Sequence, residues 1–109
     1  MFKKSQRLSE REFGAYFKAG KRVHTPHFTF ITAPAPSRKV AVVVSKKVAK
    51  HAVRRNALRR QVYAILRAAL QDVAPEVLIV IVKPPVQTLP RKQLAAVLRQ
   101  AIAELYKSA

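Results

Sequence analysis

The side chains best suited to chemistry in this sequence are the cations of residues 45–60. This stretch of sixteen residues holds seven of them: Lys46, Lys47, Lys50, Arg54, Arg55, Arg59 and Arg60. No aspartate or glutamate occurs between Glu12 and Asp72, so no acid close in sequence neutralises them. Guanidinium forks match phosphate oxygens, and ammonium groups bind phosphate as point charges. The stretch therefore predicts a surface that binds a polyanion, and nucleic acid is the commonest polyanion in a cell.

The overall composition favours the same partner. The 109 residues include 22 Lys and Arg against 5 Asp and Glu, which gives a net charge of +17. A small domain stays soluble with a net charge of magnitude about 2–8. Half of the residues are hydrophobic, which excludes a disordered basic tail and predicts one folded domain over residues 1–109. Nucleic acid is preferred over an anionic membrane as the partner.

Groups that could cleave a bond are sparse. A two-metal nuclease needs clustered carboxylates, whereas Asp72 is the only aspartate and the four glutamates are scattered. His24 and His27 lie three residues apart on a segment expected to be extended, so their side chains would not share a face. Cysteine is absent. We therefore expect no catalytic residue, no metal site and no cofactor bound by the protein itself.

Targeting signals are also missing from the sequence. The first residues carry charges with no apolar segment behind them, unlike a secretory signal peptide. The longest apolar run, 77–82, is far shorter than the roughly 20 residues that span a bilayer. We expect a soluble protein in the cytoplasm, a compartment that the absence of cysteine also fits.

Hydrophobic patterns predict the elements that carry these groups. Ser9 and Glu12 form a capping-box pattern, which predicts a short helix that ends near Gly20, with Gly20 at the C′ position. Three segments have the patterns of strands: 27–33, 40–44 and 77–82, and 21–24 could add a short edge strand. Apolar residues at three- and four-residue spacing predict a helix over 52–71 and a last helix from Pro90. The apolar strands on either side of the basic helix are expected to pair in parallel.

The predicted helix over 52–71 has a polar face beside its apolar stripe. At 100° per residue, an arc of about 100° collects Asn56, Arg59, Arg60, Tyr63 and Arg67. An ordinary solvated helix face mixes acids with bases at four-residue spacing, and this face has no acid. The lysines at 46, 47 and 50 come just before the helix, where its macrodipole and free N–H groups also favour anions.

Four phenylalanines form a second candidate site. Aromatic rings can stack on single-stranded bases, at about 1–3 kcal/mol per base. The candidates are Phe13, Phe17, Phe28 and Phe30. Each could equally be a core residue. On the strand over 27–33, Thr29 and Ile31 could supply the inner face, and this favours exposed rings at Phe28 and Phe30.

These residues together resemble the protein subunit of bacterial ribonuclease P. The family signature is Ser/Ala-Lys-Lys near a strand end, then an Ala, an Arg-Asn pair and a basic pair inside a helix. Its counterparts here are Ser45-Lys46-Lys47, Ala52, Arg55-Asn56 and Arg59-Arg60. The first half is similar too, with Glu12-Phe13, Phe17, Gly20-Lys21-Arg22, Phe28 and Phe30 in the family's order. Ala49, Ala57 and Tyr63 depart from the pattern, standing where a glycine, a basic residue and an arginine are common.

The resemblance implies a fold and a role. The fold is an α+β two-layer sandwich in helix–strands–helix–strand–helix order, with a mixed sheet and a left-handed β-α-β crossover, similar to ribosomal protein S5 domain 2. The role is endoribonuclease action as a holoenzyme subunit in tRNA 5′ maturation: the catalytic RNA, which requires Mg²⁺, removes the 5′ leader of precursor tRNA. No membrane and no protein partner is required.

The resemblance also assigns the two candidate sites. The residues expected to contact the catalytic RNA are Lys46, Lys47, Lys50, Arg55, Asn56, Arg59, Arg60 and Arg67. The residues expected to line a cleft for the leader are Phe13, Phe17, Phe28 and Phe30. Two other functions remain open: a ribosomal-protein-like structural RNA-binding module without a processing role, and a DNA-binding domain that uses the basic helix in the major groove.

Overall fold

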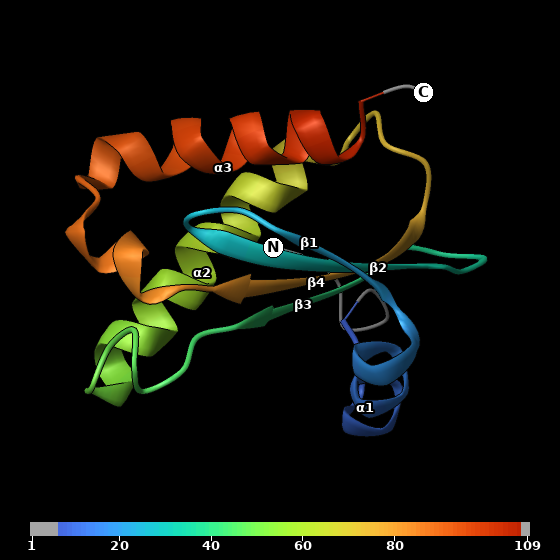
Figure 1. Cartoon of the computed structure of the whole chain (residues 1–109), viewed down its shortest axis with the longest axis horizontal. Helices are drawn as coiled ribbons and strands as arrows, with labels where there is room; N and C mark the ends of the chain where they lie inside the picture. The colour runs from blue at the N-terminus through green and yellow to red at the C-terminus, as the bar shows by residue number, and fades with distance from the viewer. Residues whose placement is uncertain (1–6, 108–109) are drawn as a thin grey trace.

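The computed structural model describes residues 7–107, which form three α-helices, four strands and one 3₁₀ helix (Figure 1). Their bounds are α1 Glu10–Ala19, β1 Lys21–His24, β2 Phe28–Pro34, β3 Lys39–Val43, α2 Ala52–Ala69, β4 Glu76–Val82, η2 Pro84–Thr88 and α3 Arg91–Leu105. The order confirms the sequence prediction, and element ends differ by one or two residues. The 3₁₀ helix η2 was not predicted.

The four strands form one mixed sheet in the order β1-β2-β4-β3. β3 and β4 pair in parallel, as expected for strands joined through the helix α2, and the other pairs are antiparallel. β4 lies inside the sheet, where residues 77–80 are all buried. Burial on both faces explains why this strand reads as a continuous apolar run rather than an alternating one.

Two apolar cores lie on opposite faces of the sheet. The larger is built by α2 and α3, whose buried residues are Leu58, Val62, Leu66, Leu94, Leu98 and Ile102, against one face of β2, β3 and β4. The smaller joins Ile31, Val77 and Ile79 to the apolar side of α1. Figure 1 shows α1 across the sheet from the layer of α2 and α3. The fold therefore offers two separate sides for ligands.

Gly20 follows α1 as its C-cap, but not in the left-handed conformation that the predicted C′ role would need. Its φ of −71° and ψ of 158° are extended. A Cβ at this position would lie 2.4 Å from Ile31 Cγ2 and 2.8 Å from the Tyr16 carbonyl oxygen. Glycine is thus required by the close approach of α1 to β2.

We expect Gly20→Ala to destabilise the protein by about 1–3 kcal/mol, because one of those contacts must give way. Urea unfolding followed by circular dichroism measures the change. Gly14 is the matched control, because it lies in the same helix and a Cβ there would meet nothing within 4 Å. Gly14→Ala should stabilise the protein by about 0.5–1 kcal/mol through helix propensity. Equal effects of the two substitutions would contradict the steric explanation.

Candidate nucleic-acid interface

The polar arc of α2 is exposed in the structure as predicted, except at Arg59 and Tyr63. Asn56, Arg60 and Arg67 are exposed, and Arg59 is half-buried. The Arg59 Nη1 donates a hydrogen bond of 2.6 Å to Asn56 Oδ1. The amide thus holds one guanidinium in a fixed direction on the helix surface. Preorganisation of this kind lowers the entropy that a phosphate contact would cost.

Tyr63 corrects one part of the predicted arc. Its ring is half-buried against the larger core, and its hydroxyl accepts a hydrogen bond of 3.3 Å from the Val42 backbone N–H. β3 is an edge strand among the described residues, and the phenol satisfies a donor on its outer side, which none of the other three strands pairs. The prediction that Tyr63 is presented to a ligand beside the guanidiniums is wrong, because the residue fastens α2 to the sheet edge.

A turn before α2 carries the three predicted lysines. Val48 and Ala49 are buried in the larger core, and the N–H groups of both donate to the Ser45 carbonyl, at 3.0 and 3.3 Å. Between and beside these anchors, Lys46, Lys47 and Lys50 are all exposed. The turn therefore places three ammonium groups at the start of the basic helix. We call these lysines, together with Asn56, Arg59, Arg60 and Arg67, the α2 basic surface.

Arg55 behaves differently from these cations. It is half-buried, and its Nη1 donates to the carbonyl oxygens of Ala49 at 3.1 Å and Lys50 at 2.7 Å. The guanidinium is thus directed back onto the turn that carries the lysines. The sequence motif named Arg55 as an RNA contact and could not show these backbone partners.

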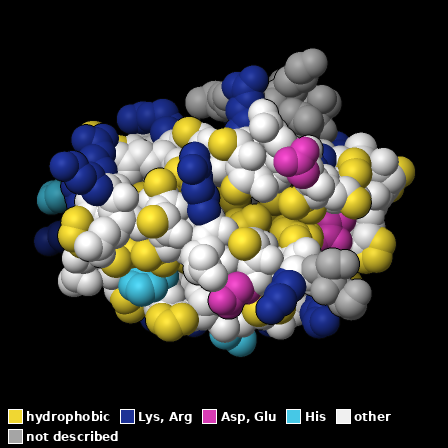
Figure 2. Space-filling view, turned by 90° about the horizontal axis from the view of Figure 1, so that it is seen from above, with side chains coloured by type: hydrophobic (Ala, Val, Ile, Leu, Met, Phe, Trp, Pro, Cys, Tyr) yellow, Lys and Arg dark blue, Asp and Glu magenta, His cyan; other side chains and the backbone are white. Residues whose placement is uncertain are grey.

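The α2 basic surface has no acidic partner within residues 7–107, where the one ion pair joins Lys39 Nζ to Glu12 Oε2 at 4.0 Å. Arg54, on the side of α2 that faces α3, and Arg91, at the start of α3, add further cations around a hollow of about 210 Å³. Figure 2 shows Lys and Arg side chains gathered at the end of the molecule where Figure 1 places the starts of α2 and α3. Unneutralised charge of this density attracts a polyanion.

Helix α1 brings together the other candidate residues. Phe13 and Phe17 are half-buried, with ring centroids 5.5 Å apart, and they pack with Tyr16 against the smaller core. We call these three the α1 aromatic patch. The Arg22 Cζ lies 4.5 Å from the Phe17 ring centroid, and Arg22 Nη2 donates to the Phe17 carbonyl at 2.9 Å. A cation beside exposed aromatic carbon is the combination that single-stranded nucleic acid binds.

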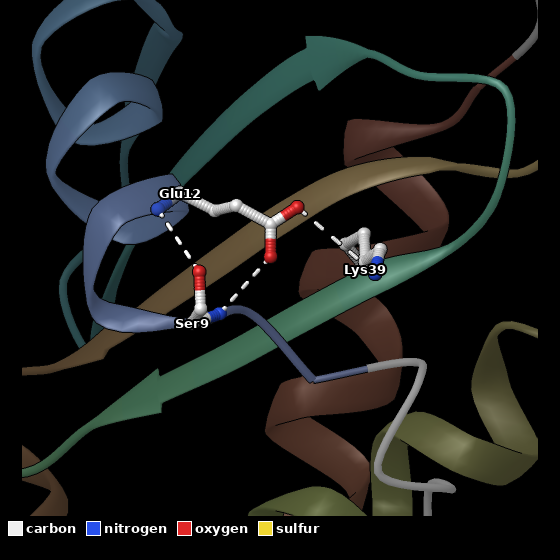
Figure 3. Close-up of polar contacts among 3 residues, drawn as sticks. All are labelled: Ser9, Glu12 and Lys39. Atoms are coloured by element: carbon white, nitrogen blue, oxygen red, sulfur yellow. Dashed lines mark hydrogen bonds and ion pairs between the residues drawn. The ribbon is translucent and has the colours of Figure 1, made fainter.

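The capping box of α1 is formed as predicted, and it fixes the patch against the sheet (Figure 3). The Ser9 N–H donates to Glu12 Oε1 at 3.1 Å, and the Glu12 N–H donates to Ser9 Oγ at 3.2 Å. The Ser9 N–H that bonds this carboxylate, then the Ser9 side chain and Lys39 on β3, hold the pKa of the Glu12 carboxyl below its ordinary value. The carboxylate therefore stays ionised and ties the first turn of α1 to β3.

Phe28 and Phe30 do not belong to this patch, so the prediction that they line a ligand cleft is wrong. Both are fully buried in the larger core beneath α2 and α3, with ring centroids 5.9 Å apart. The alternation of β2 was read correctly, since Ile31 lies on the opposite face with α1. The error concerned burial, because helices cover both faces of β2.

Sequence reasoning missed Arg22 and Tyr16 as members of the α1 site. Tyr16 shares the apolar side of a helix whose pattern was recognised, so its spacing could have included it. Arg22 was seen only as part of a motif, and its approach to Phe17 depends on the turn at Gly20.

Within the described residues, no helix is long and apolar enough to cross a membrane, and no three His, Cys, Asp or Glu side chains form a group that could hold a metal ion.

Comparison with known proteins gives a consistent result. Residues 2–106 match the protein family described as Ribonuclease P. The chain is 43% identical over 76 residues to the ribonuclease P protein component of Microcystis aeruginosa, which covers 62% of each chain. It is 30% identical to the ribonuclease P protein component of Cyanothece sp., in an alignment that covers 95% of each chain. The match to the first relative thus spans less than two thirds of that protein, and the second spans nearly all.

Solved structures support the fold. The ribonuclease P protein of Staphylococcus aureus superposes with a TM-score of 0.83 at 22% identity, over 95% of this chain and 97% of that one. The protein of Thermotoga maritima superposes with a TM-score of 0.74 at 24% identity, over 93% and 94%. At these identities the likeness is evidence for the shared fold.

Proposed function

The chain belongs to the bacterial ribonuclease P protein family, and we propose that it binds the catalytic RNA of that enzyme through the α2 basic surface and the 5′ leader of precursor tRNA through the α1 aromatic patch. The family role is that of the protein component in tRNA processing. The observation that carries the RNA assignment is the set of exposed, acid-free cations on α2 and its preceding turn.

The contribution of the α2 basic surface is electrostatic. The catalytic RNA and the precursor tRNA are both polyanions that repel each other. A protein with a net charge of +17 lowers that repulsion and displaces condensed counterions from the phosphates it contacts. Less Mg²⁺ is then needed to hold the two RNAs together. In this proposal the Mg²⁺ ions and the bond cleavage belong to the RNA.

The contribution of the α1 aromatic patch is to distinguish precursor tRNA from mature tRNA. Helix α1, which carries the patch, lies across the sheet from α2 and α3 (Figure 1), so the two RNAs can occupy different sides of one small domain. Bases of a single-stranded leader can stack on the Phe13 and Phe17 side chains while Arg22 contributes a cation. Mature tRNA has no leader, so these contacts favour binding of the precursor over the product.

Reconstitution tests the proposed function. Precursor tRNA is incubated with a bacterial ribonuclease P RNA at low Mg²⁺, with and without the protein, and the cleavage site is mapped. We expect cleavage at the mature 5′ end only when both components are present. Binding to the RNA without any gain in cleavage would refute the processing role and favour a structural RNA-binding module. Cleavage by the protein alone would refute the assignment of catalysis to the RNA.

A further inference from the structure

The hydrogen bonds of Arg55 set it apart from the other cations of α2. Its Nη1 donates to the carbonyls of both Ala49 and Lys50, at 3.1 and 2.7 Å, and the side chain is half-buried. Two carbonyl oxygens of the protein thus accept hydrogen bonds from this guanidinium. The head group points toward the turn that carries the lysines.

The two carbonyls belong to residues just before the helix, where the helical hydrogen-bond ladder offers them no donor. His51 is the N-cap of α2, and its side chain makes no capping hydrogen bond. On the turn itself, the apolar anchors are Val48 and Ala49, which are buried in the larger core. Arg55 therefore links the first turn of α2, through hydrogen bonds, to the backbone of the turn at residues 45–50. We call this turn, which carries the three lysines, the lysine turn.

We propose that Arg55 is a positioning residue, which binds RNA indirectly by holding the lysine turn against α2. In this role it sets where the ammonium groups of Lys46, Lys47 and Lys50 lie relative to Arg59 and Arg60. The proposal rests on the proposed function and deepens it. It differs from the expectation drawn from the family resemblance, in which Arg55 contacts the RNA itself.

Substitution of Arg55 by lysine distinguishes a positioning role from direct contact with the RNA. A lysine at position 55 keeps the charge, but its compact ammonium lacks the planar fork that reaches both carbonyls. If Arg55 positions the turn, Arg55→Lys and Arg55→Ala should weaken binding to the ribonuclease P RNA by similar factors of about 5–10. The salt slope of log K should fall by the same amount in both variants, because each displaces the lysines from their phosphate contacts although Arg55→Lys keeps its own charge.

A double-mutant cycle measures the coupling between Arg55 and the lysines in RNA binding. A residue that only stabilises the fold would show no such coupling. Lys46→Ala with Lys47→Ala is measured in the wild-type and the Arg55→Ala backgrounds. If Arg55 positions these lysines, their removal should cost about tenfold in the wild type and less than threefold in the variant, because the two changes are coupled. Independent phosphate contacts would give the same factor in both backgrounds.

Controls separate the possible failures. Arg99→Lys makes the same change at an exposed position of α3, outside the α2 basic surface, and should bind like the wild type. Urea unfolding gives the fraction of each variant that is unfolded in the binding buffer. If partial unfolding accounts for the whole loss of affinity, the proposal is overturned. So would rescue by Arg55→Lys, in affinity or in salt slope. A wild-type protein that fails to bind the RNA would instead refute the proposed function.

Discussion

Removal of both guanidiniums at Arg59 and Arg60 is expected to weaken binding to the ribonuclease P RNA by about 10- to 100-fold at physiological salt. Each charge-assisted contact contributes about 1 kcal/mol or more, and 1.4 kcal/mol corresponds to a factor of ten. The Arg59→Ala, Arg60→Ala variant should also lose about 1.4–1.8 from the salt slope of log K, because two phosphate contacts are lost. Filter binding over a range of salt concentrations measures both quantities.

The matched control removes two cations from another exposed surface. Arg99, on α3, and Lys107, just after it, are exposed outside the α2 basic surface, and their double alanine variant has the same net charge as the Arg59, Arg60 variant. It should bind with nearly the wild-type slope, because long-range attraction is screened within about 10 Å at 0.1 M salt. If both variants lose the same affinity and slope, RNA binding depends on overall charge and not on α2.

The elements of this fold could be predicted because hydrophobic spacing decides them locally. The capping box at Ser9 and Glu12 forms with both hydrogen bonds, and β3 pairs in parallel with β4, as expected for strands that a helix connects. Gly20 was placed correctly at the end of α1, but for the wrong reason. Its requirement comes from the Ile31 side chain, a neighbour that no local pattern specifies.

The parts of the site that could not be predicted depend on tertiary contacts. A helical wheel gives the angle of Tyr63 but not its distance from the open edge of β3, where its hydroxyl meets the Val42 N–H. The alternation of β2 separates Phe30 from Ile31, yet it cannot say that helices cover both faces. Arg55 shows the same limit, because a long side chain can point back to the backbone before its own helix.

Phe17→Ala is expected to weaken binding of leader-bearing precursor tRNA to the holoenzyme by about 5- to 150-fold and to leave mature tRNA nearly unaffected. The loss corresponds to one base stack of about 1–3 kcal/mol, together with the platform on which Arg22 lies. Equilibrium binding of the two substrates to the reconstituted enzyme gives the ratio. Because Phe17 also packs on the smaller core, Phe17→Leu should retain most of the stability and still lose the preference for the leader.

Phe30 provides the sharpest control, because it is the same residue type and was predicted from sequence to share the leader site. It is fully buried on the other face of the sheet, so Phe30→Leu should cost stability, by about 1 kcal/mol, and should leave the ratio of precursor to mature tRNA affinity unchanged. A changed ratio would mean that the ring at Phe30 reaches the leader. An equal loss for both substrates on Phe17→Ala would mean that the α1 aromatic patch does not read the leader.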